Sequence, residues 1–126
     1  MQKKIIEGHE FRILDTKGKV RAVLGVTDSS ITGEAIGISL IDPSGQERTW
    51  MGVNTDGESV LCFYDSTDRR DNVNPRLMLI SEKSGAALLI MDTDGKTLMR
   101  LRVMQEGGEI LLYSPESKKP KRVITA

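Results

Sequence analysis

At 126 residues, the chain has the length of one domain that can bury a core without disulfides or bound metals. Its 18 basic and 18 acidic side chains leave no net charge, which argues against a nucleic-acid partner and against attraction to an anionic membrane. The single cysteine, Cys62, excludes an internal disulfide framework and a cysteine-built zinc site.

The N-terminal stretch Met1–Phe11 carries two lysines but no apolar run of the length of a signal peptide. No segment of the chain approaches the roughly 20 apolar residues of a membrane helix. We therefore expect a cytoplasmic location, unless an export signal has been removed.

Three stretches share one pattern, in which an apolar run enters a tight turn and an alternating run leaves it. They are Phe11–Val26, Ile38–Val53 and Leu88–Val103. Weaker copies surround Asp65 and Ser114, so the spacings between successive turn-opening residues are 27, 23, 27 and 22. Because repeats of this length indicate one reused supersecondary unit, we predict a single domain over residues 1–126 built from five β-hairpin repeats. The five turn-opening residues, called anchors below, are Asp15, Asp42, Asp65, Asp92 and Ser114.

Three of these turns read Asp-x-x-Gly, from Asp15, Asp42 and Asp92. An aspartate at the first turn position accepts hydrogen bonds from backbone N–H groups two residues on, and glycine adopts the positive φ that closes the turn. Turn signals recur along the whole chain, which predicts an all-β antiparallel meander of about ten strands with no substantial helix. The glycines that mark the turns at the opposite strand ends are Gly33, Gly57, Gly85, Gly107 and Gly108.

Side chains two residues apart share one face of a strand. Large apolar residues stand two and four positions before every anchor, and mostly apolar residues stand seven, nine and eleven positions after Asp15, Asp42 and Asp92. This pattern predicts that one face of the sheet is the core. The residues assigned to it are Phe11, Ile13, Ala22, Leu24, Val26, Ile38, Leu40, Thr49, Met51, Val53, Leu61, Phe63, Leu88, Ile90, Met99, Leu101, Val103, Ile110 and Leu112.

The opposite face also carries an apolar row, because the residue just before each anchor is apolar in all five copies. A second apolar row on an outer face either packs on another part of the chain or contacts a partner, most simply a copy of the same chain, and we favour the partner. We predict a sheet curled into a barrel-like or prism-like shape that forms a homo-oligomer. The row, called the stripe below, is the predicted interface: Leu14, Ile41, Tyr64, Met91 and Tyr113.

Two further surfaces are candidates for contact with a ligand or partner. Arginine beside aromatic residues suits an anionic or sugar-like ligand, and the stripe face carries Arg21, Arg48 and Arg100 with Trp50. The alternative is an exposed face whose arginines pair with nearby acids. The third turn lacks its glycine and becomes a long charged loop, in which the candidate contact residues are Asp68, Arg69, Arg70 and Asp71.

The phrase Asp-x-x-Gly-[Lys/Gln]-x-Arg, present as Asp15–Arg21 and Asp42–Arg48, resembles phrases in bacterial β-hairpin-repeat proteins of unknown function. The resemblance covers most of the chain and implies repeated antiparallel hairpins. It implies no activity, cofactor or catalytic residue.

No set of residues predicts catalysis, a metal site or a cofactor. Asp92–Gly95 resembles the opening of a calcium loop, but the twelfth position, which needs a glutamate, is Val103. The lone His9 has no partner of the kind a triad or metal cluster needs, and Cys62 lies in an apolar strand. We therefore predict a non-catalytic structural or interaction module that self-associates. The alternative is a small-ligand-binding β-barrel, with its site at the arginine–Trp50 face or at the barrel mouth.

Overall fold

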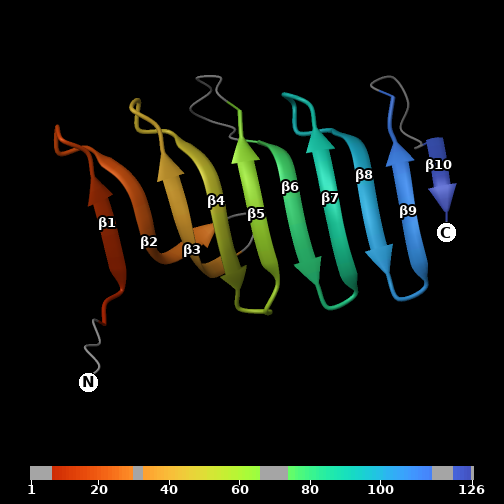
Figure 1. The fold of residues 1–126 in the computed structure, drawn as a ribbon, viewed down its shortest axis with the longest axis horizontal. Helices are drawn as coiled ribbons and strands as arrows, with labels where there is room; N and C mark the ends of the chain where they lie inside the picture. Colours follow the sequence, from red (N-terminus) through yellow and green to blue (C-terminus); the bar gives the residue numbers. More distant parts are fainter. Residues whose placement is uncertain (1–6, 30–32, 66–73, 115–120, 126) are drawn as a thin grey trace.

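The computed structural model describes residues 7–29, 33–65, 74–114 and 121–125, which leaves Asp68, Arg69, Arg70 and Asp71 outside the described residues. Within the described residues the chain forms ten β-strands and no helix (Figure 1). The strands are β1 Glu10–Leu14, β2 Val20–Ser29, β3 Gly33–Ile41, β4 Glu47–Asn54, β5 Ser59–Tyr64, β6 Pro75–Glu82, β7 Gly85–Met91, β8 Thr97–Met104, β9 Gly107–Leu112 and β10 Lys121–Thr125.

All ten strands form one sheet whose order follows the chain, from β1 at one edge to β10 at the other (Figure 1). Every neighbouring pair is antiparallel. The prediction of an all-β antiparallel meander is therefore confirmed. The sheet is open, so the predicted barrel-like or prism-like closure is not confirmed for the single chain, and the five-fold hairpin repeat stays a prediction.

The Asp-x-x-Gly turns form as predicted. At the first of them, the Asp15 carboxylate accepts hydrogen bonds from the backbone N–H groups of Lys17 and Lys19 at 2.9 and 3.0 Å. Gly18 closes this turn with a φ of 76°, a conformation that favours glycine. Equivalent hydrogen bonds reach the carboxylates of Asp42 and Asp92. Local turn chemistry thus sets the hairpins at this end of the sheet.

The two faces of the sheet differ in burial in the opposite sense from the prediction. The buried cluster lies on the stripe face and consists of Ala35, Trp50, Val60, Cys62, Met78 and Met91. The face predicted to be the core is open to solvent: Ile13 is 66% exposed, Leu40 49% and Val53 47%. For the single chain, the assignment of the core to that face is wrong.

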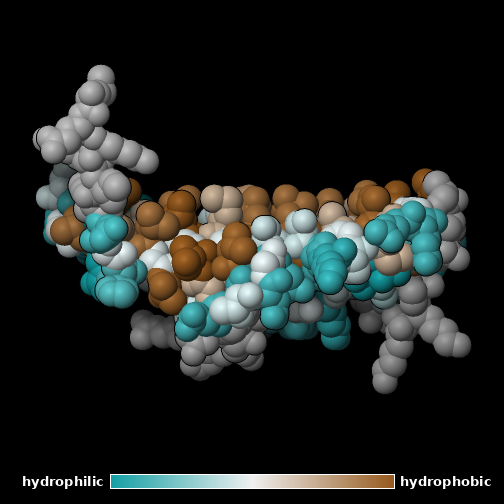
Figure 2. All heavy atoms as spheres, turned by 90° about the horizontal axis from the view of Figure 1, so that it is seen from below, coloured by the Kyte–Doolittle hydropathy of each residue, from teal (hydrophilic) through white to brown (hydrophobic). Residues whose placement is uncertain are grey.

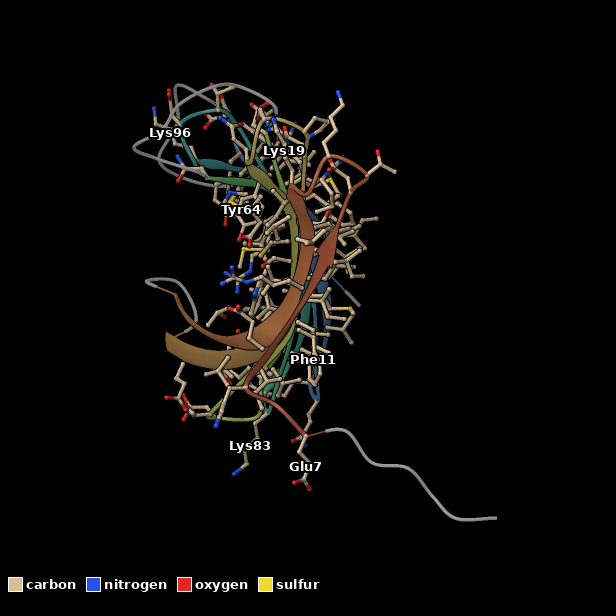
Figure 3. The ribbon with its side chains drawn as sticks, turned by 90° about the vertical axis from the view of Figure 1, so that its left-hand side faces the viewer. Glu7, Phe11, Lys19, Tyr64, Lys83 and Lys96 are labelled. Atoms are coloured by element: carbon tan, nitrogen blue, oxygen red, sulfur yellow. The ribbon has the colours of Figure 1, made fainter. Side chains whose placement is uncertain are left out.

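The reason is the curvature of the strands together with the absence of a second layer. Viewed from the β1 edge, the strands bend around the side that holds Tyr64, with Phe11 on the convex side (Figure 3). Side chains on the concave side converge and cover each other. Those on the convex side diverge, and no other described part of the chain lies over them.

Glycines allow the tight packing on the concave side. Gly25, Gly37 and Gly52 lie side by side on three neighbouring strands. The indole of Trp50 lies against two of them, since a Cβ added at Gly52 would come within 2.6 Å of the ring and one added at Gly37 within 2.9 Å. Trp50 is 5% exposed as a result. The concave side therefore holds the core of the single chain.

Candidate interaction surface

A row of large apolar residues crosses the convex side from one edge of the sheet to the other. Each member is directly opposite the next in the strand register, beginning with Phe11 opposite Leu24 on β1 and β2 and ending with Ile110 opposite Ile124 on β9 and β10. Direct cross-strand neighbours of this kind stand close enough to form a continuous ladder. The row, called the spine below, is Phe11, Leu24, Ile38, Met51, Leu61, Leu79, Leu88, Leu101, Ile110 and Ile124.

Two further rows flank the spine, one nearer the Asp-x-x-Gly turns and one nearer the opposite turns. The first includes Leu40 opposite Thr49, and the second includes Ile36 opposite Val53. Every exposed large hydrophobic side chain of the described residues except Leu14 belongs to the spine or to these flanking rows. Figure 2 shows the resulting hydrophobic layer along one side of the sheet and hydrophilic atoms gathered on the other. The spine and its flanking rows are called the outer apolar face below.

The outer apolar face is large for a monomer. If each exposed side chain leaves roughly 80 Å² to solvent, the face presents on the order of 1,000 Å² of apolar surface, against about 300–600 Å² for the largest patch of a typical monomer. A shallow hollow of about 700 Å³ lies within it, lined by residues of β2 to β8. Its lining is apolar apart from Ser59 and Ser81. Exposed apolar patches of this size mark contact sites for a protein, a membrane or a ligand.

Two of the arginines predicted as ligand contacts, Arg21 and Arg48, make polar contacts within the chain. Arg21 lies near Asp15 of its own turn, at 3.7 Å, and its Nε donates to the backbone carbonyl of Ile41 at 2.9 Å. The same arrangement recurs one hairpin later, where Arg48 pairs with Asp42 at 2.5 Å and donates to the backbone carbonyl of Asp65. Each arginine therefore ties its own turn to the end of a later strand. The alternative that these arginines pair within the chain fits the structure.

Arg100 lies apart from this system, on β8 beside Arg102, which pairs with Glu109 at 2.6 Å. The Nε atoms of both arginines are buried and have no hydrogen-bond partner among the described residues. The recess beside them measures about 50 Å³, which has room for a water molecule or a small ion and not for a sugar. Trp50 is covered, so it offers no stacking surface to a ligand. A ligand site on this side stays a prediction.

The stripe residues differ widely in exposure. Met91 is 7% exposed and belongs to the buried cluster, and Tyr64 packs against that cluster. Burial raises the pKa of the Tyr64 hydroxyl and of the Cys62 thiol beside it. Ile41 and Tyr113 are half-buried, and only Leu14, on the edge strand β1, is 56% exposed. The stripe thus contributes mainly to the core of the single chain, and its role as an interface stays a prediction.

Eight of the ten spine residues belong to the face that the sequence predicts to be the core, and the pattern around the anchors does not assign the other two, Leu79 and Ile124. The signal that distinguishes the two faces is the row of Gly25, Gly37 and Gly52 together with Trp50. Glycines in matching positions on neighbouring strands mark the side toward which another group approaches closely, and hence the concave side.

These features define a class of structure, a single-layer antiparallel meander in which the described residues leave one apolar face uncovered. No protein-family model matches the chain, and no curated protein matches it either. Among the described residues, no helix is long and apolar enough to cross a membrane, and no group of three His, Cys, Asp or Glu side chains could hold a metal ion. The cytoplasmic location stays a prediction.

Proposed function

We propose that the chain is a non-catalytic structural module that assembles with copies of itself through the outer apolar face. The observation that carries the proposal is the spine, an uninterrupted apolar ladder across all ten strands over which the described residues place no second layer. Stable domains pack at least two layers around a hydrophobic core, and the described part of this chain supplies one. A second copy supplies the missing layer.

The size and charge of the surface support a copy of the chain as the occupant. A standard interface buries about 800 Å² on each partner, and the outer apolar face offers about that much apolar surface. No residue of the spine is charged, so copies of the chain can meet there without burying unpaired charges.

The test compares two variants that each introduce one carboxylate, the first on the spine and the second away from it. Leu79→Asp puts a carboxylate on the spine of β6, and Lys83→Asp puts one at an exposed position in the following turn as the matched control. By sedimentation velocity we expect the wild type and Lys83→Asp to form the same assembly. We expect Leu79→Asp to fall to the 13.9 kDa mass of one chain or to unfold, because a buried carboxylate has no partner there. An unchanged sedimentation coefficient for folded Leu79→Asp would show that the outer apolar face is not the interface.

A second candidate function is the binding of an apolar small molecule in the hollow of the outer apolar face. Its volume of about 700 Å³ falls in the range of ligand pockets, about 300–1,000 Å³. This differs from the anionic or sugar-like ligand expected from the sequence, because the lining offers only Ser59 and Ser81 as polar side chains. An apolar fluorescent dye distinguishes the two functions. Saturable binding of one dye per chain to the wild type supports the binder, and no binding until Leu79→Asp exposes the face supports self-assembly.

A further inference from the structure

The shape of the outer apolar face restricts the number of copies that can cover it and the direction in which they lie. The spine reaches both edges of the sheet, from Phe11 on β1 to Ile124 on β10. A partner sheet crossing at a right angle would cover the middle strands and leave both ends in water. The partner sheets must therefore run along the whole length of the spine, with their long axes parallel to it.

The curvature of the strands then separates two copies from three. The outer apolar face is convex along the strand direction (Figure 3). Two convex faces placed back to back touch along their spines, and the flanking rows on either side diverge into solvent. Those rows include Leu40 and Ile36, which are 49% and 63% exposed in the single chain. A dimer leaves much of this surface uncovered.

Three bent sheets around one axis cover it. In this arrangement, the flanking row nearer the Asp-x-x-Gly turns in one copy faces the flanking row nearer the opposite turns in the next copy. This is a heterologous contact that closes after three copies. The spine supplies a large apolar residue at every level of the axis. The flanking rows, which pack against one neighbour at the sheet spacing of about 10 Å, are also mainly apolar, with Ala22, Thr49 and Ser81 as small or hydroxyl members.

We infer that three copies of the chain assemble around an axis parallel to the long axis of the sheet, with the spine of each copy at that axis. This inference rests on the proposed function and specifies its stoichiometry and geometry. The concave side, with Arg21, Arg48 and the turn aspartates, faces outward in this assembly.

Counting linked chains tests the geometry. Leu101→Cys in a Cys62→Ala background places one thiol per chain on the spine of β8, and a short bismaleimide links thiols in pairs. Around a threefold axis three thiols converge, so we expect at most two of every three chains to be linked, while the third chain carries a reagent attached at one end only. In a dimer every chain can be linked. Arg100→Cys in the same background is the matched control, because it lies on the same strand and the opposite face and should give no linked chains.

Native mass of the unlabelled wild type completes the test. A mass of three times 13.9 kDa supports the inference. A mass of two chains overturns the inference and leaves the proposed function standing, and a mass of one chain overturns both. Leu79→Cys is the second variant should Leu101→Cys fail to fold. If both variants fold and neither links more than the control, the spine does not lie at the axis and the inference is wrong.

Discussion

At the scale of single residues, the turn aspartates are structural acceptors. Asp42 accepts hydrogen bonds from the Ser44 hydroxyl at 2.5 Å, from backbone N–H groups of its turn, and from Arg48. The Ser44 hydroxyl, the backbone of Gln46 and Arg48 together hold the pKa of this carboxyl well below its ordinary value. The backbone N–H of Lys19 lowers the pKa of Asp15 in the same way. These carboxylates are bound as anions within their own turns.

This binding predicts a pH dependence of stability. Because the folded-state pKa of Asp15 and Asp42 is depressed, their contribution is present above the unfolded pKa of about 4 and is lost as the pH falls below it. We expect the urea midpoint to fall between about pH 4 and pH 2, and to fall less in Asp42→Asn, whose amide can still accept the turn hydrogen bonds. The control is Asp56→Asn, in a turn whose N–H groups bond to Asn54. An equal acid dependence in Asp42→Asn and wild type contradicts this role.

A second residue-scale prediction concerns the glycines under Trp50. A Cβ at position 52 would meet the backbone oxygen of Ile36 at 2.6 Å as well as the indole, so Gly52→Ala must displace one of them. We expect it to lower the free energy of unfolding by about 1–3 kcal/mol. Gly108→Ala is the control, since its Cβ has no neighbour nearer than 3.5 Å. Urea unfolding followed by Trp50 fluorescence measures both. Similar small effects for the two variants would show that the concave side is loosely packed.

At the scale of strands and turns, the sequence predicted what depends on local chemistry. The Asp-x-x-Gly phrases predicted the turns, and the alternation of residues predicted the strands and the two sets of side chains. Which of the two sets is buried could not be predicted in the same way, because both faces are apolar. On β7, for example, Met91 of the concave side and Leu88 of the spine belong to one apolar run. Which face becomes concave depends on side-chain volume across several strands, such as that of Trp50 over Gly37, and not on any one strand.

The two faces can be compared by truncation. Met91→Ala removes side-chain volume from the concave core, where Met91 is 7% exposed, and should cost about 2–4 kcal/mol. Leu79 is 43% exposed in the single chain, so its truncation would be mild in a monomer. If copies cover the spine, we expect Leu79→Ala to cost about as much as Met91→Ala. Urea unfolding at one fixed protein concentration gives both values. A loss below about 1 kcal/mol for Leu79→Ala alone contradicts burial of the spine.

At the scale of the whole molecule, the closure of the sheet could not be predicted from the sequence. A meander of ten strands can bury an apolar face by curling upon itself or by packing on copies, and both solutions use the same alternating pattern. The structure has an open sheet with β1 and β10 at its edges, and no other part of the chain that the structure describes covers the outer apolar face. If copies of the chain cover that face, folding and assembly are coupled, because the sheet gains its second layer when copies meet.

Coupled folding and assembly predicts that thermal stability depends on protein concentration. We expect the Tm of the wild type to rise when the concentration is raised 100-fold, since association stabilises the folded state by mass action. Differential scanning calorimetry over that range measures it. A Tm that is independent of concentration, together with reversible unfolding, indicates a sheet that is stable as a single copy.

The most direct test of self-assembly is the mass of the unaltered chain in solution, measured by sedimentation equilibrium. We expect a single species at a whole multiple of 13.9 kDa, with three copies by the geometry of the outer apolar face. A single folded species of 13.9 kDa at all concentrations would contradict it, because the spine would then remain exposed in a stable protein.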